Sequence, residues 1–181
     1  MVALLIIDML KDFIEKGAVL EVPQGRDIIN NIRRLIDAAH SKGVPVIYIC
    51  DAHSKDDHEF KYWPPHAIKG TRGAEVINEL SPSEGDIVIE KRRYSGFFQT
   101  DLDLTLRERN IKSLILTGVL TNVCVFFTAA DAFMRGYNLI IVSDGTASLS
   151  KEDHTWSLNQ AKNILKAEIL NTEEVIRKYL S

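Results

Sequence analysis

The chain has 181 residues, a size typical of one folded domain, and we expect residues 1–181 to form a single domain. Hydrophobic residues are 45% and charged residues 26%, as in ordinary globular proteins, and the net charge of −3 argues against nucleic-acid binding. No apolar run approaches the ~20 residues of a membrane helix, and the N-terminus lacks the basic start of a signal peptide. Two cysteines give no disulfide framework. We therefore expect a cytoplasmic protein without nucleic-acid or membrane partners.

Short apolar runs alternate with amphipathic segments along the chain. The runs that predict buried strands are residues 2–7, 44–50, 87–90, 113–117, 139–142 and 167–170. The segments that predict helices are 27–40, 73–80, 102–109, 123–134, 150–166 and a C-terminal helix from Thr172. Residues 52–72 have no clear period and predict a long loop, which in a compact domain is usually functional. This alternation predicts an α/β fold, a three-layer sandwich of a six-stranded parallel sheet with helices on both faces.

Reactive residue types follow the ends of several predicted strands. Asp8, Asp51 and Lys91 each end a strand, and a short turn leads from another strand to Cys124. Ligands of parallel α/β sheets bind beyond the carboxyl ends of the strands, so we expect these four residues at one edge of the sheet. Each alone has an ordinary explanation, as a cap or a solvated charge. Together they predict a reactive site.

Cys124 is the candidate nucleophile. Gly118 is expected to end the preceding strand, and Thr121 or Asn122 to cap the next helix, which places Cys124 in its first turn. The free N–H groups and the positive end of the helix dipole there predict a depressed pKa for the thiol and a donor cluster for an oxyanion. The alternative is that Cys124 is a small buried hydrophobic residue, as free cysteines often are.

The long loop carries a candidate metal site. Asp51 and His53 stand two residues apart at a strand end, His66 follows in the same loop, and His58 lies between them. Carboxylate and imidazole sets of this kind suit Zn²⁺, Fe²⁺ or Mn²⁺. The alternative is a polar loop that binds no metal. His154 has the pattern of an ordinary helix residue and is assigned no role.

Three segments in this order resemble the isochorismatase-like cysteine hydrolases, which include nicotinamidases and N-carbamoylsarcosine amidases. LLIIDMLKDF resembles the first-strand motif, VIEKRRYSGFFQTDL the lysine segment and LTGVLTNVCV the nucleophile turn. The resemblance spans nearly the whole chain and implies a six-stranded parallel sheet with helices on both sides. It also implies that Asp8, Lys91 and Cys124 are catalytic. In this family the peptide bond at the position of Val119 and Leu120 is usually cis.

The loop DAHSKDDHEFKYWPPHAIKGTRGAE is similar to that of nicotinamidases. The resemblance implies that Asp51, His53 and His66 bind a divalent metal, zinc with iron or manganese as alternatives, and that His58 is an optional fourth ligand. It implies that aromatic residues stack on the substrate. The residues expected to bind substrate are Phe13, Trp63, Val119 and Leu120. Two features depart from nicotinamidases. Leu120 stands where they usually have alanine, and the segment after Lys91 is more similar to the amidase and isochorismatase-like branch.

The resemblance implies a cysteine amidohydrolase acting on a small-molecule amide. Asp8 would take the Cys124 proton, the thiolate would form a thioester with release of ammonia, and backbone N–H groups of Leu120 and Cys124 would hold the oxyanion. We expect nicotinamide as the substrate. The alternative is an N-carbamoylsarcosine-type substrate, whose carboxylate would need a cation such as Arg72, Arg92 or Arg93.

Two readings from other functional classes are less consistent with the sequence. A phospho-accepting signalling domain would have an acidic pair after its first strand, whereas Met9 follows Asp8 here. An inactive binding protein on the same fold is disfavoured because Asp8, Lys91 and Cys124 are all present. The resemblance also implies a homo-oligomer, although the sequence shows no clear interface patch.

Overall fold

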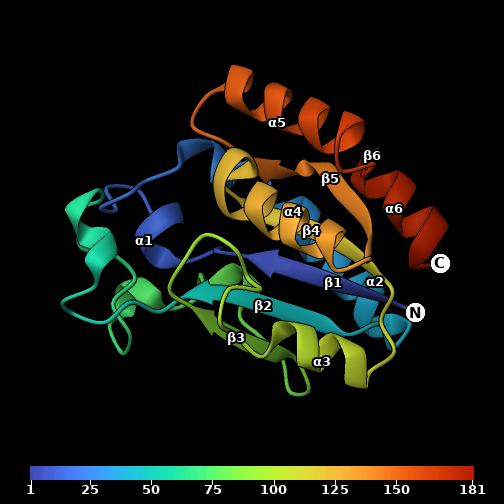
Figure 1. Cartoon of the computed structure of the whole chain (residues 1–181), viewed down its shortest axis with the longest axis horizontal. Helices are drawn as coiled ribbons and strands as arrows, with labels where there is room; N and C mark the ends of the chain where they lie inside the picture. The colour runs from blue at the N-terminus through green and yellow to red at the C-terminus, as the bar shows by residue number, and fades with distance from the viewer.

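The computed structural model describes residues 1–181 and is built on one parallel sheet of six strands. The strand order is β3-β2-β1-β4-β5-β6 (Figure 1), which confirms the predicted α/β class. The strands are β1 (Val2–Ile7), β2 (Val46–Asp51), β3 (Ile87–Lys91), β4 (Ser113–Val119), β5 (Asn138–Ala147) and β6 (Glu168–Leu170).

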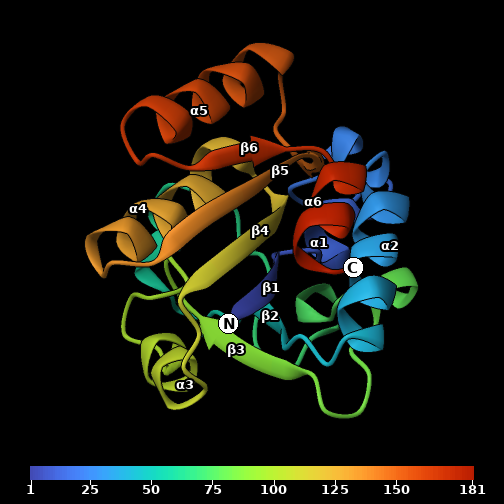
Figure 2. The ribbon, with the colours of Figure 1, turned by 90° about the vertical axis from the view of Figure 1, so that its right-hand side faces the viewer.

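Helices cover both faces of the sheet, as predicted. Figure 2 shows α1 (Lys11–Ile14), α2 (Ile29–Ser41) and α6 (Thr172–Tyr179) on one side. The other side holds α3 (Leu102–Glu108), α4 (Phe126–Met134) and α5 (Lys151–Asn163). No helix of the chain combines the length and the apolar character required to cross a membrane.

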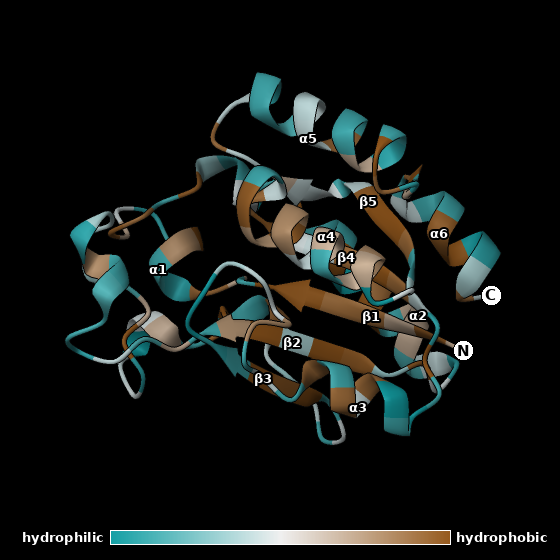
Figure 3. Cartoon of the chain, in the orientation of Figure 1, coloured by the Kyte–Doolittle hydropathy of each residue, from teal (hydrophilic) through white to brown (hydrophobic).

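The core has two parts because successive residues of a strand point to opposite faces of the sheet. In β1, Leu4 and Ile6 pack against the layer with α2, whereas Ala3, Leu5 and Ile7 pack against the layer with α4. A strand covered on both faces has no polar side, so its sequence is continuously apolar. Figure 3 shows this as brown strands between helices that carry teal outer turns.

The carboxyl ends of β1 and β4 form the switch point of the topology. From β1 the chain adds strands toward β3, and from β4 it adds strands toward β6. Connections after these two neighbouring strands therefore leave toward opposite faces and open a crevice between them. Asp8 follows β1 and the Cys124 turn follows β4, so both residues border this crevice.

Gly118 does not end its strand, contrary to the sequence expectation. It pairs within the sheet, with Ile7 on one side and Thr146 on the other, and its φ is 105°. A Cβ atom at this position would lie 1.9 Å from the carbonyl oxygen of Ile7. Glycine is required here because only a residue without a side chain allows this approach and this backbone conformation.

The helix predicted at residues 73–80 is absent. Two short 3₁₀ turns, Arg72–Ala74 and Asn78–Leu80, stand in its place. A third 3₁₀ turn, His58–Lys61, lies inside the long loop after β2. Segments of this length bury few side chains against the sheet, which lets the loop fold over its carboxyl edge (Figure 1).

Candidate active site

Asp8 lies buried directly after β1. Its backbone has a φ of 52°, and its N–H donates to the carbonyl oxygen of Ile49, which continues the pairing of β1 with β2. One carboxylate oxygen accepts a hydrogen bond of 2.9 Å from the Asp51 N–H, and the other lies 2.8 Å from Lys91 Nζ. The side chain is therefore fixed by residues at the ends of β2 and β3.

Lys91 is the last residue of β3, and its ammonium group is fully buried at the centre of the site. Nζ lies 2.5 Å from Asp51 Oδ1, 2.8 Å from Asp8 Oδ2 and 3.5 Å from the Cys124 sulfur. Although burial opposes it, these two carboxylates raise the pKa of Lys91 well above its ordinary value. Lys91 is thus a permanent positive charge between the acid pair and the thiol.

Cys124 stands in a π-helical turn, Thr121–Val125, rather than in the first turn of the α-helix. The Val125 N–H bonds to the carbonyl oxygen of Leu120, and α4 begins only at Phe126. The sequence predicted that Thr121 or Asn122 caps the N-terminus of the helix, but neither residue does so. π-Helical turns are often found at functional sites.

The pKa of Cys124 is raised, which contradicts the depressed value expected from the helix terminus. Burial raises it well above the ordinary value of a thiol, and Asp8 and Asp51 add to the rise, whereas Lys91 opposes it. Burial and Asp51 also raise the pKa of Asp8 to about 6. At neutral pH the site therefore holds a thiol beside an ionised Asp8, which is a proton acceptor of useful strength.

The Val119–Leu120 peptide bond is cis, as in the resembled family. The Leu120 N–H has no acceptor within the chain, so it is free to donate to a substrate. It stands four residues before the sulfur of Cys124. This position suits the oxyanion donor that the sequence assigned to Leu120.

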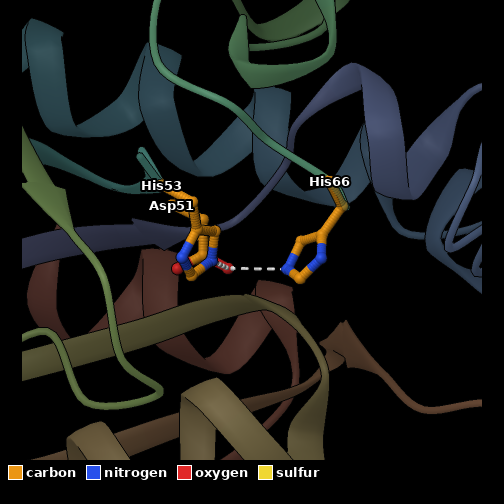
Figure 4. A group of neighbouring side chains, drawn as sticks. All are labelled: Asp51, His53 and His66. Carbon is orange, nitrogen blue, oxygen red and sulfur yellow. Dashed lines mark ion pairs between the residues drawn. The ribbon is translucent and has the colours of Figure 1, made fainter. Parts of the chain in front are cut away.

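Asp51, His53 and His66 come together at one point, with ligand atoms that all lie within 4.8 Å of one another (Figure 4). Asp51 Oδ2 is 3.6 Å from His53 Nε2 and 3.9 Å from His66 Nε2. Ligands of a tetrahedral zinc ion lie about 3.3 Å apart, given bonds of ~2.0–2.1 Å. The three donors are therefore spaced to hold one cation after a small contraction.

The outer contacts of this set fit a metal as well. His66 Nδ1 bonds to the carbonyl oxygen of Pro64 at 2.8 Å, and His53 Nδ1 lies 3.2 Å from Asp57 Oδ2. Both imidazoles thus direct Nε2 toward Asp51, as metal-binding histidines do when a second group holds the other nitrogen. His53 Nε2 is buried and has no hydrogen-bond partner. A cation bound between the three residues would give this nitrogen a partner.

His58 does not join the set. It is exposed in the 3₁₀ turn of the loop, where its ring packs against Tyr62 at 6.2 Å between centroids. Asp57 and Glu59, rather than His58, are the buried residues of this segment. The optional fourth ligand predicted from the sequence is therefore not placed at the cluster.

A cavity of about 280 Å³ opens over these groups and has mainly apolar walls. Every residue expected to bind substrate lines it: Phe13, Trp63, Val119 and Leu120. Asp8, Asp51, His66 and Cys124 also line it, so two residues of the metal set and the thiol face one space. A small molecule in this cavity can contact both.

Comparison with known proteins identifies the family. The family model described as the isochorismatase domain matches residues 2–174. The chain belongs to the isochorismatase family. A relative from Arabidopsis thaliana, named a "probable inactive nicotinamidase", is 36% identical over 90% of this chain and 88% of its own.

Solved isochorismatase-family structures include amidases with different substrates. N-carbamoylsarcosine amidase from Thermoplasma acidophilum is 35% identical, with a TM-score of 0.88 over 95% of this chain and 96% of its own. Nicotinamidase/pyrazinamidase from Bacillus subtilis is 36% identical, with a TM-score of 0.90 over 94% and 99%. Pyrazinamidase of Pyrococcus horikoshii, solved in complex with zinc, is 30% identical, with a TM-score of 0.88 over 94% and 98%.

Several residues that line the cavity of this isochorismatase-family site are not predicted from the sequence, and two of them carry polar groups of interest. Tyr94 lines the cavity, and its hydroxyl accepts a hydrogen bond of 2.9 Å from Trp63 Nε1. Glu59 also lines it, and burial together with Asp51 raises the pKa of this carboxyl. Nothing in the local sequence distinguishes either residue, because only the fold of the loop turns them inward.

Proposed function

We propose that this protein is a cysteine amidohydrolase that hydrolyses a neutral, flat carboxamide, with nicotinamide converted to nicotinate as the reaction. The proposal rests on one observation: the cavity has aromatic and aliphatic walls and no lysine or arginine among its lining residues. Phe13, Trp63 and Tyr94 line the cavity, and a ring stacked on a flat substrate contributes ~0.5–1.5 kcal/mol beyond burial.

The cations that a carbamoyl acid would require are engaged elsewhere. Arg92 Nε lies 2.7 Å from Asp57 Oδ2, and Arg93 lies 3.0 Å from the other oxygen of the same carboxylate. Arg72 pairs with Glu15 at 2.6 Å. A substrate carboxylate in the cavity would have no arginine or lysine side chain among the lining residues to pair with, and burial of an unpaired charge costs several kcal/mol.

The chemistry follows from the arrangement of Asp8, Lys91 and Cys124. Asp8 accepts the thiol proton as the sulfur attacks the amide carbon, and Lys91 favours the developing thiolate. The N–H groups of Leu120 and Cys124 hold the oxyanion of the tetrahedral intermediate. Asp8 then returns its proton to the leaving nitrogen, and ammonia departs as the C–N bond breaks.

Hydrolysis of the thioester completes the cycle. Asp8, again ionised, takes a proton from water, and the resulting hydroxide attacks the acyl carbon. The C–S bond breaks, and the proton held by Asp8 returns to sulfur. We assign a divalent cation to Asp51, His53 and His66, and its chemistry when bound is to orient the substrate as a Lewis acid, with zinc as the metal we expect.

Ammonia release from a panel of amides tests the substrate. Nicotinamide should be hydrolysed with a kcat/KM at least ~100-fold above that of N-carbamoylsarcosine, because an unpaired buried carboxylate costs more than the ~2.8 kcal/mol that this factor represents. Trp63→Ala should lower kcat/KM for nicotinamide about 2- to 10-fold, because the lost ring contact contributes ~0.5–1.5 kcal/mol, and should reduce the preference by the same factor. If the carbamoyl compound reacts faster, the arginines are in reach after all and the carbamoyl amidase alternative holds.

A further inference from the structure

The short helix α1 lies against the long loop that follows β2 (Figure 1). Two neighbouring residues of the helix contact this loop close to the metal set. The Phe13 ring packs on the His66 ring, with 5.5 Å between their centroids. Oδ2 of Asp12 accepts a hydrogen bond of 2.8 Å from the Ala67 N–H. The helix therefore contacts His66 at its ring and also at the backbone that follows it, and the proposed reaction gives Asp12 no part.

Ala67 connects the two metal-binding histidines through its backbone. It directly follows His66 and is fully buried. Its φ of 42° lies in the left-handed region, which is unfavourable for a residue with a side chain. Its N–H donates to Asp12, and its carbonyl oxygen accepts a hydrogen bond of 2.9 Å from the His53 N–H. Ala67 therefore links Asp12 to both histidines of the metal set.

Gly73 leaves the space in which the Asp12 carboxylate lies. A Cβ atom at this glycine would be 2.1 Å from Oδ2 and 2.4 Å from Oδ1 of Asp12. The backbone of Gly73 does not have a positive φ, so its conformation does not require glycine. The close approach of the carboxylate is what requires a residue without a side chain. The Asp12 carboxylate is thus packed closely against Gly73 while it bonds to Ala67.

We propose that Asp12 is a positioning residue for the metal set. By holding the Ala67 N–H, its carboxylate keeps His53 and His66 in the places from which both Nε2 atoms can bind one cation. Without the carboxylate, the buried N–H of Ala67 would be left without an acceptor, and its left-handed conformation would lose a restraint. This role rests on the metal assigned under the proposed function and not on the identity of the substrate.

Zinc affinity measures this role without any assay of activity. Metal-free protein is titrated with Zn²⁺ in competition with a chromophoric chelator. Asp12→Ala should bind zinc ~10–100-fold more weakly than the wild type, the usual effect of removing a group that orients metal ligands. Asp12→Asn keeps a side-chain oxygen for the Ala67 N–H and should recover most of the affinity. Amide hydrogen exchange at Ala67 should be faster in Asp12→Ala than in the other two proteins.

A substitution at Gly73 tests the same carboxylate from its other neighbour. Gly73→Ala places a methyl group where the Asp12 carboxylate lies and should displace it, so zinc should bind at least ~10-fold more weakly. In protein that already carries Asp12→Ala there is no carboxylate to displace, so adding Gly73→Ala should cause no further loss. This non-additivity separates the loss of one hydrogen bond from general damage to the fold.

Glu75→Ala is the matched control. The Glu75 side chain pairs with Lys11 of the same helix at 2.5 Å and is 59% exposed, so its removal takes away a contact of α1 but leaves the Ala67 N–H bonded. Zinc affinity should stay within ~2-fold of the wild type.

Wild-type affinity in Asp12→Ala, no recovery in Asp12→Asn, or an equal loss in Glu75→Ala overturns the positioning role. A wild type that binds no zinc overturns it together with the metal assignment. Protein that binds zinc with this dependence on Asp12 but leaves nicotinamide unreacted would refute the proposed substrate alone.

Discussion

At the scale of single residues, the site depends on how the positive charge of Lys91 acts on the carboxylates around it. One buried ammonium group serves two buried carboxylates, Asp8 and Asp51, and lies 3.5 Å from the Cys124 sulfur. Although burial opposes it, Lys91 lowers the pKa of Asp51, whereas that of Asp8 rises to about 6. The two acids therefore differ: Asp51 is a constant anion within the metal set, and Asp8 is a proton acceptor beside the thiol.

Cys124 should therefore react selectively but without the low pKa expected from the helix terminus. Iodoacetamide should alkylate Cys124, which lines the cavity, at least ~10-fold faster than Cys50, and the rate should still rise above pH ~8.5, the usual thiol pKa. Peptide mass spectrometry against time and pH measures this. Cys124→Ala should abolish ammonia release. Equal labelling of both thiols, or full activity in Cys124→Ala, would contradict the assignment.

At the scale of elements, the nucleophile turn is held by the segment that follows β5. Thr121 Oγ1 lies 2.8 Å from His154 Nδ1 of α5, and the hydroxyl of Ser148 donates to Asn122 Oδ1 at 3.0 Å. The sequence pattern alone indicates that His154 is an ordinary helix residue. Its bond joins α5 to the residue next to Leu120, so we expect His154 to act as a positioning residue for the turn.

Removing this bond should impair turnover rather than binding. His154→Leu should lower kcat about tenfold, since a net hydrogen bond contributes ~0.5–1.5 kcal/mol, while KM changes little. His154→Asn is the matched control, because its side-chain amide reaches the place of Nδ1 and should restore most of kcat. Steady-state kinetics and the Cys124 alkylation rate report the effect. Equal activity in both variants, or equal loss, would show that the bond has no positioning role.

At the scale of the whole molecule, the metal set fastens the long loop to the sheet. Asp51 ends β2, whereas His53 and His66 lie in the loop that covers the carboxyl edge. His53 also holds the loop through Asp57, whose carboxylate pairs with Arg92 after β3. A cation bound here would join the end of β2 to two points of the loop.

Metal removal should accordingly lower stability. Protein purified without chelator should contain close to one divalent ion per chain by elemental analysis. Dialysis against a chelator should reduce Tm, because a ligand at ~1,000 times its Kd stabilises the native state by ~4 kcal/mol. His53→Ala should lack the ion and should show no further change of Tm with chelator. Wild type without metal, or a chelator effect of the same size in His53→Ala, would argue for a polar loop that binds none.

The sequence by itself determined the layered fold and the residues that gather at one edge of its sheet. Both follow from local rules, since apolar runs of strand length alternate with amphipathic segments and parallel strands place their carboxyl ends together. Asp8, Asp51, Lys91 and Cys124 could be brought together on that basis. The histidine spacing in the loop after β2 likewise predicted the metal set without its geometry.

Only the tertiary structure decided properties that depend on several segments at once. The pKa of Cys124 is raised because burial and two carboxylates from other strands outweigh the lysine. The arginines proposed to bind a carboxylate pair with Asp57 and Glu15, acids remote in sequence. The inward position of Glu59 likewise depends on how the loop packs. Charge interactions and buried area depend on all the neighbours of a residue in space, and the order of residues in the sequence does not reveal those neighbours.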